Sequence, residues 1–397
     1  MDLDDLRWLL TDDGQALLAE AVAVLAAEPA TPDPLRVSAS LRRRHPGTDP
    51  AHVAAALTQA TLRRRAEAKL GEEARLLYFT PDGLEQATRR AVADHRAARL
   101  RAFEAISLVD LGCGIGGDLM AGARAGIVCA GVDLDPVRVE VARANLAALG
   151  LDGATVVADA TTVDTSPFDV AFADPARRTA RGRTFDVDDW TPPWSFVEGL
   201  LRRDACVKVA PGIPHDLVPD GVEAEWVSDH GEVKEAALWA GRLATTRRRA
   251  TVIGDGGLAT LTDEDDPGAP VRSLGAYLYE PDGAVVRAGL VTAVAAAHAG
   301  DDAGLLDPHI AYLTSDSATR TPFARGYEVV EELPYREKQL RVALRERGVG
   351  RLTIKKRGVD VVPEQLRKRL ALQGDGEATL VMTRVAGEGT ALLVRPL

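Results

Sequence analysis

The sequence has few cysteines, no long apolar run and no overall excess of positive charge. Its three cysteines, Cys113, Cys129 and Cys206, form no CxxC pair and have no histidine at metal-ligand spacing, which argues against a disulfide framework and a zinc site. The first ten residues, MDLDDLRWLL, lack the basic start and apolar core of a signal peptide. No stretch approaches the roughly 18 uncharged apolar residues of a membrane-spanning helix. We therefore expect a cytoplasmic protein with no metal and no membrane partner.

Charge is distributed unevenly along the 397 residues. The formal net charge of −11, taken as one value, argues against bulk coating of nucleic acid or anionic membrane. Residues 1–35 carry −7 and residues 104–319 carry −17, whereas residues 36–103 carry +7 and residues 320–397 carry +6. The two basic segments therefore leave room for a localised contact with a polyanion.

Hydrophobic patterning changes near Ser107. The preceding residues are rich in Ala and Leu, lack β-branched runs and place Pro50 where a first-turn proline fits, so this part is expected to be helical. Short apolar runs then follow, each closed by an acidic residue or a turn: SLVDLG, IVCAGVD, ATVVAD, FDVAFAD and ACVKVAP. Helix-compatible stretches such as 136–149 lie between some of them. Strands that alternate with helices predict a parallel sheet covered on both faces.

The last third contains a second α/β pattern. Residues 255–275 are rich in Gly, Asp and Pro and are expected to form a linker or long surface loop. After a helix near 282–297, the expected elements are strands 327–333, 351–356, 379–385 and 391–394, with helices 336–347 and 363–372. The expected domains are a helical domain at 1–104, an α/β domain at 105–255, a linker with a connecting helix at 256–322 and a small α/β domain at 323–397.

A glycine-rich turn follows the first predicted strand. Residues 109–117 read VDLGCGIGG, and glycines at a strand-to-helix turn let the backbone bend sharply and approach a ligand. Gly112, Gly114 and Gly117 also satisfy the dinucleotide pattern GxGxxG, so the glycines alone do not identify the ligand. Gly116 and Gly117 also suit close packing of helix against strand.

Carboxylates at the strand ends narrow the choice of ligand. Asp110 would repel the pyrophosphate of a dinucleotide but attract the ammonium group of S-adenosylmethionine, which has a sulfonium and no phosphate. Asp133 ends the next strand, where an acidic side chain can accept hydrogen bonds from both ribose hydroxyls. Asp159 closes the third strand and suits the adenine amino group, although each aspartate alone would also suit a helix N-cap or a turn. The expected cofactor is S-adenosylmethionine, bound by Asp110, Gly112, Gly114, Gly116, Asp133 and Asp159.

The sequence resembles the class I S-adenosylmethionine-dependent methyltransferases in three segments, VDLGCGIGGD, GVDLDP and VVADAT, which are similar to the first three motifs of that family. The resemblance covers roughly residues 105–255. It implies a Rossmann-like, seven-stranded sheet whose last strand is antiparallel. It also implies a cofactor at the carboxyl ends of the strands and S-adenosylhomocysteine as the product.

The fourth predicted strand ends in Asp174 and Pro175. This place is similar to the Asp/Asn-Pro-Pro-aromatic motif of methyltransferases that modify exocyclic amines of bases. The resemblance implies that the Asp174 carboxylate and the Pro175 carbonyl accept hydrogen bonds from the target amine, with proline supplying a rigid turn. Ala176 and Arg177 replace the second proline and the aromatic residue, and the Arg177 guanidinium suits stacking on a base or binding a phosphate. The alternative is that Asp174 only forms the turn.

The basic carboxyl-terminal segment predicts an anion-binding surface. A strand at 351–357 with Leu352 and Ile354 inward places three cations, Arg351, Lys355 and Arg357, on its opposite face. A helix that starts at Pro363 then leaves Arg367, Lys368 and Arg369 largely outside. We expect Arg351, Lys355 and Arg357 to bind the phosphates of a substrate; the alternative is an ordinary solvated charged face.

Two further segments resemble a family of bacterial class I methyltransferases with a carboxyl-terminal THUMP-like domain. They are RGVGRLTIKKRGVDVVPEQLRKRL near the end of the chain and LYFTPDGLEQATRRAVADHRAARL before the core. The likeness of this domain to true THUMP domains implies RNA, such as tRNA or rRNA, as a partner.

The sequence as a whole predicts an enzyme that transfers a methyl group to an exocyclic amine of a base in structured RNA, by direct displacement without a metal. Three alternatives stay open. One is a small-molecule or protein methyltransferase with the same core, and another is a non-catalytic RNA-binding protein that retains the cofactor fold. The third is an NAD-dependent oxidoreductase.

Overall fold

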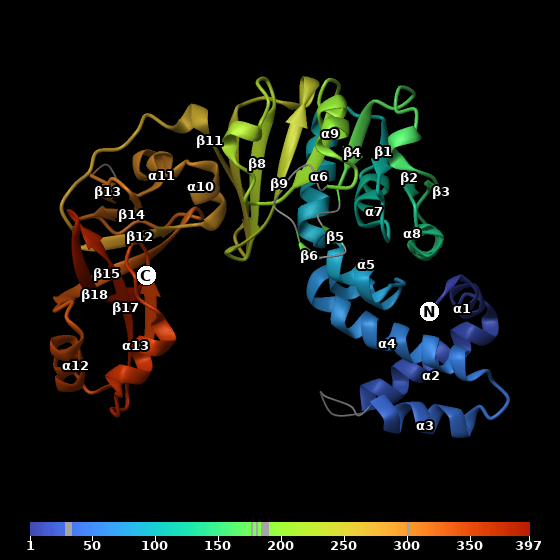
Figure 1. Cartoon of the computed structure of the whole chain (residues 1–397), viewed down its shortest axis with the longest axis horizontal. Coiled ribbons are helices and arrows are strands. Elements are labelled where there is room, and N and C mark those ends of the chain that lie inside the picture. Colours follow the sequence, from blue (N-terminus) through green and yellow to red (C-terminus); the bar gives the residue numbers. More distant parts are fainter. Residues whose placement is uncertain (28–33, 176–177, 180–181, 184–189, 300–301) are drawn as a thin grey trace. The chain divides into compact units, whose positions relative to one another are not determined.

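The computed structural model describes residues 1–27, 34–175, 178–179, 182–183, 190–299 and 302–397. The chain forms two compact units (Figure 1). The first unit consists of residues 1–209 and 238–243, and the second unit consists of residues 210–237 and 244–397. All the predicted cofactor-binding residues belong to the first unit. None of the helices that the structure describes is long and apolar enough to cross a membrane.

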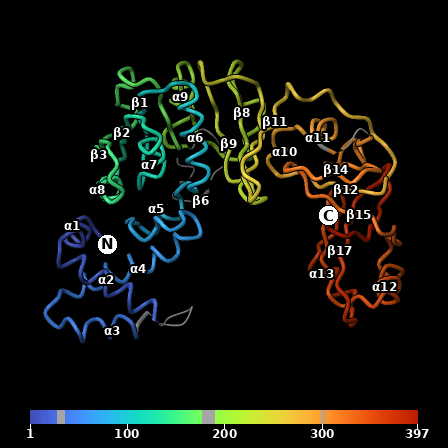
Figure 2. Tube along the Cα trace, turned by 180° about the vertical axis from the view of Figure 1, so that it is seen from behind, coloured from blue at the N-terminus to red at the C-terminus, as the bar shows by residue number. Residues whose placement is uncertain are grey.

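The first unit begins with helices, as predicted. They are α1 (Leu3–Leu9), α2 (Asp12–Ala27), α3 (Pro34–Arg44), α4 (Pro50–Leu70), the 3-10 helix η1 (Gly71–Arg75), α5 (Pro81–Gln86) and α6 (Arg90–Ala102). Asp49 caps α4 and Pro50 occupies its first turn, where the missing N–H of proline removes no helical hydrogen bond. Helices α1 to α4 (blue in Figure 2) pack together through buried leucine and alanine side chains.

Five strands of the first unit are parallel to their neighbours. They are β1 (Ser107–Leu111), β2 (Val128–Asp133), β3 (Ala154–Val157), β4 (Val170–Ala173) and β7 (Ala205–Val209), in the order β3-β2-β1-β4-β7. The connecting helices are α7 (Gly117–Arg124), α8 (Pro136–Ala148) and α9 (Trp194–Leu200). All five predicted strands are confirmed. The strand order reverses between β1 and β4, and open α/β sheets bind their ligands at such a switch point, beyond the carboxyl ends of the strands.

The second unit begins with further strands, one of which, β11, lies within the predicted linker. Strand β10 (Arg248–Gly254) is parallel to β8 (Glu223–Asp229) and antiparallel to β11 (Gly257–Thr262), while β9 (Glu232–Ala240) has residues in both units. The expected loop at 255–275 was therefore wrong for residues 257–262. Gly257 has a φ of 97°, which glycine adopts without strain, so the glycines there mark a tight hairpin turn.

A second sheet occupies the rest of this unit. Its order is β13-β14-β12-β15-β18-β17-β16. The strands are β12 (Tyr277–Pro281), β13 (Gly304–Asp307), β14 (Ile310–Ser315), β15 (Ala324–Leu333), β16 (Val349–Lys356), β17 (Gly376–Val385) and β18 (Glu388–Pro396), with helices α12 (Glu337–Glu346) and α13 (Pro363–Leu370). The elements expected after residue 323 are confirmed, including the inward Leu352 and Ile354.

Residues 256–322 are not a linker in this structure, because β12, β13 and β14 complete the second sheet. The single helix expected at 282–297 is two helices, α10 (Gly283–Ala288) and α11 (Val291–His298). Gly289, with a φ of 69°, ends α10 in the left-handed conformation, a usual helix stop.

The second sheet is strongly curled. Lys355 of β16 donates to Glu280 of β12 at 2.5 Å, although β15, β18 and β17 lie between these strands in the order. Arg357 likewise donates to the Ala311 carbonyl of β14 at 3.0 Å. The curl therefore turns one face of β16 toward the first strands of the same sheet.

Candidate functional site

The glycine loop between β1 and α7 is shaped by three left-handed glycines. The φ values of Gly112, Gly114 and Gly116 are 103°, 54° and 85°, which residues other than glycine rarely adopt. A Cβ atom on Gly116 would lie 3.2 Å from the Cβ of Ala142, whereas one on Gly114 would meet nothing within 4 Å. Gly116 is thus needed for packing, and the backbone at Gly114 stays open to a ligand.

Asp110 of β1 is a buried carboxylate at the carboxyl end of the strand. Its exposed fraction is 1%, and neither oxygen has a hydrogen-bond partner among the residues that the structure describes. Burial raises the pKa of Asp110 well above its usual range; Asp118, Asp174 and Asp133 raise it further, and Arg96 opposes them. Buried polar groups are normally hydrogen-bonded, so this carboxylate is the group that a cationic ligand would complete.

Asp133 holds the glycine loop from the end of β2. Its Oδ2 accepts the backbone N–H of Gly114 at 3.0 Å, and its Oδ1 accepts that of Asp135 at 2.9 Å. A carboxylate has about four acceptor positions, so capacity for ribose hydroxyls remains. The ribose contact stays a prediction.

Asp159 lies exposed after β3. It accepts hydrogen bonds from the backbone N–H and the hydroxyl of Thr161 at 2.9 and 2.8 Å, and it caps a 3-10 turn. The pKa of Asp159 is lowered, mainly because its carboxylate accepts the backbone hydrogen bond from Thr161. The capping role that its residue type also allowed is therefore present, and the adenine contact stays a prediction.

Asp174 and Pro175 follow β4, next to the glycine loop. A Cβ atom on Gly112 would lie 3.9 Å from the Asp174 carbonyl oxygen, so the two segments run close together. The Oδ2 of Asp174 accepts a hydrogen bond from the Lys208 ammonium of β7 at 2.6 Å, and Pro175 is buried. The predicted Arg177, like Ala176, lies outside the described residues.

Polar side chains connect Asp174 to the start of α7. Lys208 also donates to the Thr88 hydroxyl at 3.2 Å, and that hydroxyl donates to Asp118 at 3.1 Å. The buried Arg96 donates to the other oxygen of Asp118 at 2.9 Å. None of these four residues, Lys208, Thr88, Asp118 and Arg96, was predicted from the sequence. The signal for Lys208 was a single cation within the apolar run ACVKVAP.

These residues fit S-adenosylmethionine. The two oxygens of Asp110, which have no hydrogen-bond partner in the described part of the chain, suit its ammonium group. The open backbone at Gly114 allows close approach, and Asp133 keeps acceptor capacity. A dinucleotide would place its pyrophosphate near the Asp110 carboxylate, which would repel it. Within the described part of the chain, no group of three or more His, Cys, Asp or Glu residues could hold a metal ion.

The three cations that were predicted to bind phosphates, Arg351, Lys355 and Arg357, do not share one exposed face in the structure. Arg351 is largely exposed and pairs with Glu377 at 2.5 Å. Lys355 and Arg357 instead face into the curled sheet, where Lys355 binds Glu280 and Arg357 lies 5.3 Å from the centre of the Tyr312 ring. Burial alone would lower the pKa of Lys355, but the contacts with Glu280 and Tyr327 outweigh it, so the pKa is raised. Arg367, Lys368 and Arg369 on α13 are exposed, as expected.

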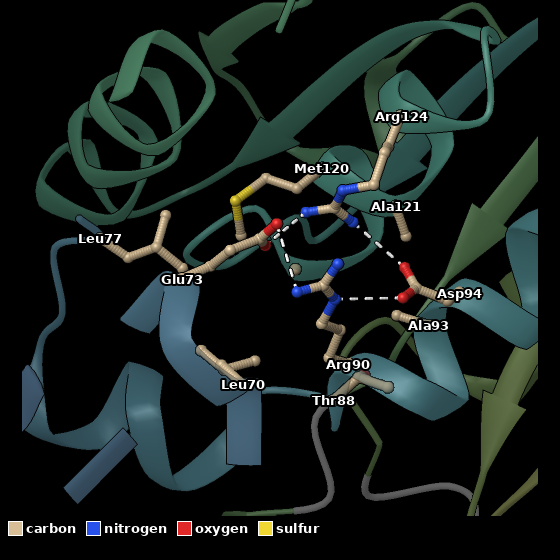
Figure 3. Close-up of a pocket in the computed structure, with 11 residues that line it drawn as sticks. Leu70, Glu73, Leu77, Thr88, Arg90, Ala93, Asp94, Met120, Ala121 and Arg124 are labelled. Carbon is tan, nitrogen blue, oxygen red and sulfur yellow. Dashed lines mark hydrogen bonds and ion pairs between the residues drawn. The ribbon is translucent and has the colours of Figure 1, made fainter. Parts of the chain in front are cut away.

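A small pocket near the glycine loop is lined by apolar residues and by four charged side chains (Figure 3). Glu73 pairs with Arg90 at 3.2 Å and with Arg124 at 2.8 Å, and Asp94 pairs with the same two arginines at 3.2 and 3.1 Å. This closed ring of alternating charges joins η1, α6 and α7. The pocket of about 20 Å³ is large enough for a single water molecule and too small for a cofactor.

We expect Arg124→Gln to destabilise the protein modestly, because the change breaks two ion pairs at once. Partly exposed pairs contribute about 0–1 kcal/mol each, so the free energy of unfolding should fall by about 1 kcal/mol in urea unfolding at low salt. The loss should shrink at high salt because ions screen the pairs. A double-mutant cycle with Glu73→Gln that gives additive effects at low salt would contradict the ring.

Three segments of the chain match known domains. Residues 108–179 match a methyltransferase domain, residues 324–396 match a family described as THUMP domain-like, and residues 2–66 match a domain of unknown function. The first match contains the glycine loop and the strand-end carboxylates.

Two relatives are named as uncharacterized S-adenosylmethionine-dependent methyltransferases of Mycobacterium tuberculosis, strains CDC 1551 / Oshkosh and ATCC 25618 / H37Rv. Each is 40% identical over 353 residues, covering 84% of this chain and 95% of the relative. A crystal structure named as a methyltransferase of Porphyromonas gingivalis W83 is 23% identical, with a TM-score of 0.74, and covers 96% of this chain and 98% of that chain. At this identity, the likeness shows the fold. Since the chain matches almost the whole length of the mycobacterial relatives, it belongs to the class I S-adenosylmethionine-dependent methyltransferases, carries a carboxyl-terminal THUMP-like domain and uses S-adenosylmethionine as its cofactor.

Proposed function

We propose that this methyltransferase modifies a base of structured RNA at an exocyclic amine. The observation that carries the proposal is the Asp174-Pro175 dipeptide, which follows β4 beside the glycine loop. An exocyclic amine has two N–H donors, so a carboxylate oxygen and a backbone carbonyl form a matching pair of acceptors. They would orient the nitrogen without needing to remove its proton first.

The cofactor supplies an electrophilic methyl group on a sulfonium centre. Asp110 would accept hydrogen bonds from the cofactor's ammonium, and the open backbone at Gly114 would let the cofactor lie against the loop. Asp133 and Asp159 would bind the ribose and the adenine. Asp174 would then fix the acceptor in line with the methyl carbon, and such alignment supplies much of the rate in direct displacement reactions.

The RNA part of the proposal is supported by the THUMP domain-like match and by exposed cations. Arg351 is exposed, and its pair with Glu377 is an exposed one that a phosphate can replace at little cost. Helix α13 adds Arg367, Lys368 and Arg369. Lys355 and Arg357 stay predicted contacts, and each would have to leave its present partner in the sheet to bind a phosphate.

Methyl transfer to fractionated acceptors tests the proposal. The protein is incubated with methyl-labelled S-adenosylmethionine and total RNA, protein or metabolite fractions, and labelled RNA is digested to nucleosides. Label on the base nitrogen of a nucleoside in the RNA fraction is the expected result. Label confined to proteins or metabolites would overturn the RNA proposal, and label on ribose would overturn the amine.

We expect exposed cations of α13 to contribute to RNA affinity through phosphate contacts. Each such contact lowers the slope of log K against log salt by about 1, so Lys368→Gln should weaken RNA binding and flatten this slope by about 1. Arg7→Gln, an exposed arginine of the acidic first segment, is the control and should change neither quantity. Filter binding between about 50 and 200 mM salt measures both. Equal slopes in all three proteins would contradict the contact.

A further inference from the structure

Lys208 is a charged residue in a strand that is otherwise apolar and buried. Its neighbours in β7 are Ala205, Cys206, Val207 and Val209, while its own side chain is 16% exposed. Partial burial of an ammonium is unfavourable unless it is paired and hydrogen-bonded. A cation retained in such a strand therefore depends on its partners.

The groups around Lys208 fix the orientation of its side chain. A carboxylate accepts only, so the Thr88 hydroxyl must donate its proton to Asp118 and can only accept from Lys208. Lys208 thus donates to both Thr88 and Asp174. An ammonium with three donors satisfies this pattern, and the side chain is held from two sides.

This arrangement occupies one oxygen of Asp174 and leaves the carboxylate in one rotational position. The Lys208 ammonium lies 2.6 Å from Oδ2, a short charge-assisted hydrogen bond. Asp174 remains partly exposed, with 36% of its side chain accessible, so the carboxylate can still reach a substrate.

We propose that Lys208 is a positioning residue for methyl transfer: by binding Oδ2 of Asp174, it directs Oδ1 toward the acceptor. Thr88 also binds the Lys208 ammonium. The Thr88 hydroxyl is held by Asp118, which in turn is bound by Arg96. The inference deepens the proposed function and rests on its assignment of Asp174 as the acceptor-binding group. It also narrows the acceptor to a group that donates a hydrogen bond, since an ionised carboxylate offers no donor.

The test compares Lys208→Met, Lys208→Arg and Thr88→Val with the wild-type protein. Single-turnover methyl transfer is measured on whichever fraction the wild type labels, and S-adenosylhomocysteine affinity is measured by calorimetry. Misplacement of a reacting group by about 1 Å can lower a rate by about 100-fold. We therefore expect Lys208→Met to lower the single-turnover rate by about 10- to 100-fold while product affinity changes by less than about threefold.

The other variants separate positioning from a structural role. Lys208→Arg keeps a donor cation and should recover part of the rate, and Thr88→Val should cause a smaller loss than Lys208→Met. Lys234→Met is the matched control, because Lys234 is also 16% exposed and pairs with Glu232; its rate should equal that of the wild type.

An unchanged single-turnover rate in Lys208→Met would overturn the inference. It would also be overturned if Lys208→Met lowered the rate and the S-adenosylhomocysteine affinity by the same factor and Lys208→Arg restored neither. Label in proteins or metabolites would contradict only the RNA proposal. The Lys208 variants would then be compared on that labelled fraction, so the inference about Lys208 would still be tested. If the wild type labels no fraction, a double-mutant cycle of unfolding with Asp174→Asn decides. Coupling of at least about fivefold in the unfolding constant supports the pair, and independent effects overturn it.

Discussion

Asp110→Asn should weaken S-adenosylmethionine binding on the order of 100-fold and, at the same time, stabilise the ligand-free protein. The first effect follows because truncating one partner of a buried charge pair costs about 2–5 kcal/mol. The second follows because the wild-type carboxylate is buried with no partner among the described residues, and an isosteric amide removes the cost of its charge. Calorimetric titration measures the affinity and thermal unfolding measures the stability. A variant that binds the cofactor normally would contradict the assignment.

The gain in stability should depend on pH with a defined sign. Burial raises the pKa of Asp110 well above its usual range, near 3.9 for an unfolded chain. A group with a raised pKa in the folded state loses its stabilising contribution as pH rises through that folded-state pKa. The wild type should therefore become less stable than Asp110→Asn as pH rises above about 4, and the difference should vanish at lower pH. Cofactor affinity of the wild type should rise over the same interval, because the ammonium needs the ionised carboxylate.

Asp174→Ala should retain cofactor binding and lose methyl transfer by about 100- to 1,000-fold. The change removes the acceptor that orients the nucleophile but leaves Asp110 and the glycine loop intact. Asp174→Asn tells positioning from base catalysis, since an amide oxygen still accepts hydrogen bonds but cannot take a proton. Lys208 and the amine would have to share this single oxygen, so if Asp174 only positions the amine, the Asn variant should lose transfer but keep more of it than the Ala variant; if it is a general base, both variants should lose transfer equally.

Asp164→Ala is the matched control for these changes. Asp164 is an exposed aspartate that accepts the backbone N–H of Ser166 at 2.9 Å, so its removal costs a turn contact and nothing at the site. Single-turnover transfer and calorimetric titration on all four proteins give the comparison. Equal transfer by Asp174→Ala and Asp164→Ala would remove Asp174 from the reaction.

The strands that position the site could be predicted because local composition and tertiary role agree there. Runs such as SLVDLG are apolar along most of the strand and carry an aspartate at or near its carboxyl end, so Asp110, Asp133 and Asp174 could be placed at one edge. Strand β11 could not, because its turn is rich in glycine and its neighbourhood in aspartate and proline. The same composition occurs in loops.

Contacts that depend on the order of strands or on the curvature of a sheet could not be predicted from sequence patterns. Lys208 meets Asp174 because β7 lies next to β4 in the sheet, although 34 positions separate them in the chain. Lys355 was expected to face solvent from the period of two along β16. The period is correct, since Leu352 and Ile354 are buried, but the curl of the sheet covers the opposite face near Lys355 and brings it to Glu280.

The central claim is that the free carboxylate of Asp110 binds the ammonium group of S-adenosylmethionine. A thermodynamic cycle tests it most directly, with S-adenosylmethionine and an analogue that lacks only the amino group each titrated into the wild type and into Asp110→Asn. The wild type should lose about 100-fold in affinity for the analogue, while Asp110→Asn should bind both ligands about equally weakly. Equal loss of affinity for the analogue in both proteins would contradict the claim, because the ammonium would then bind elsewhere.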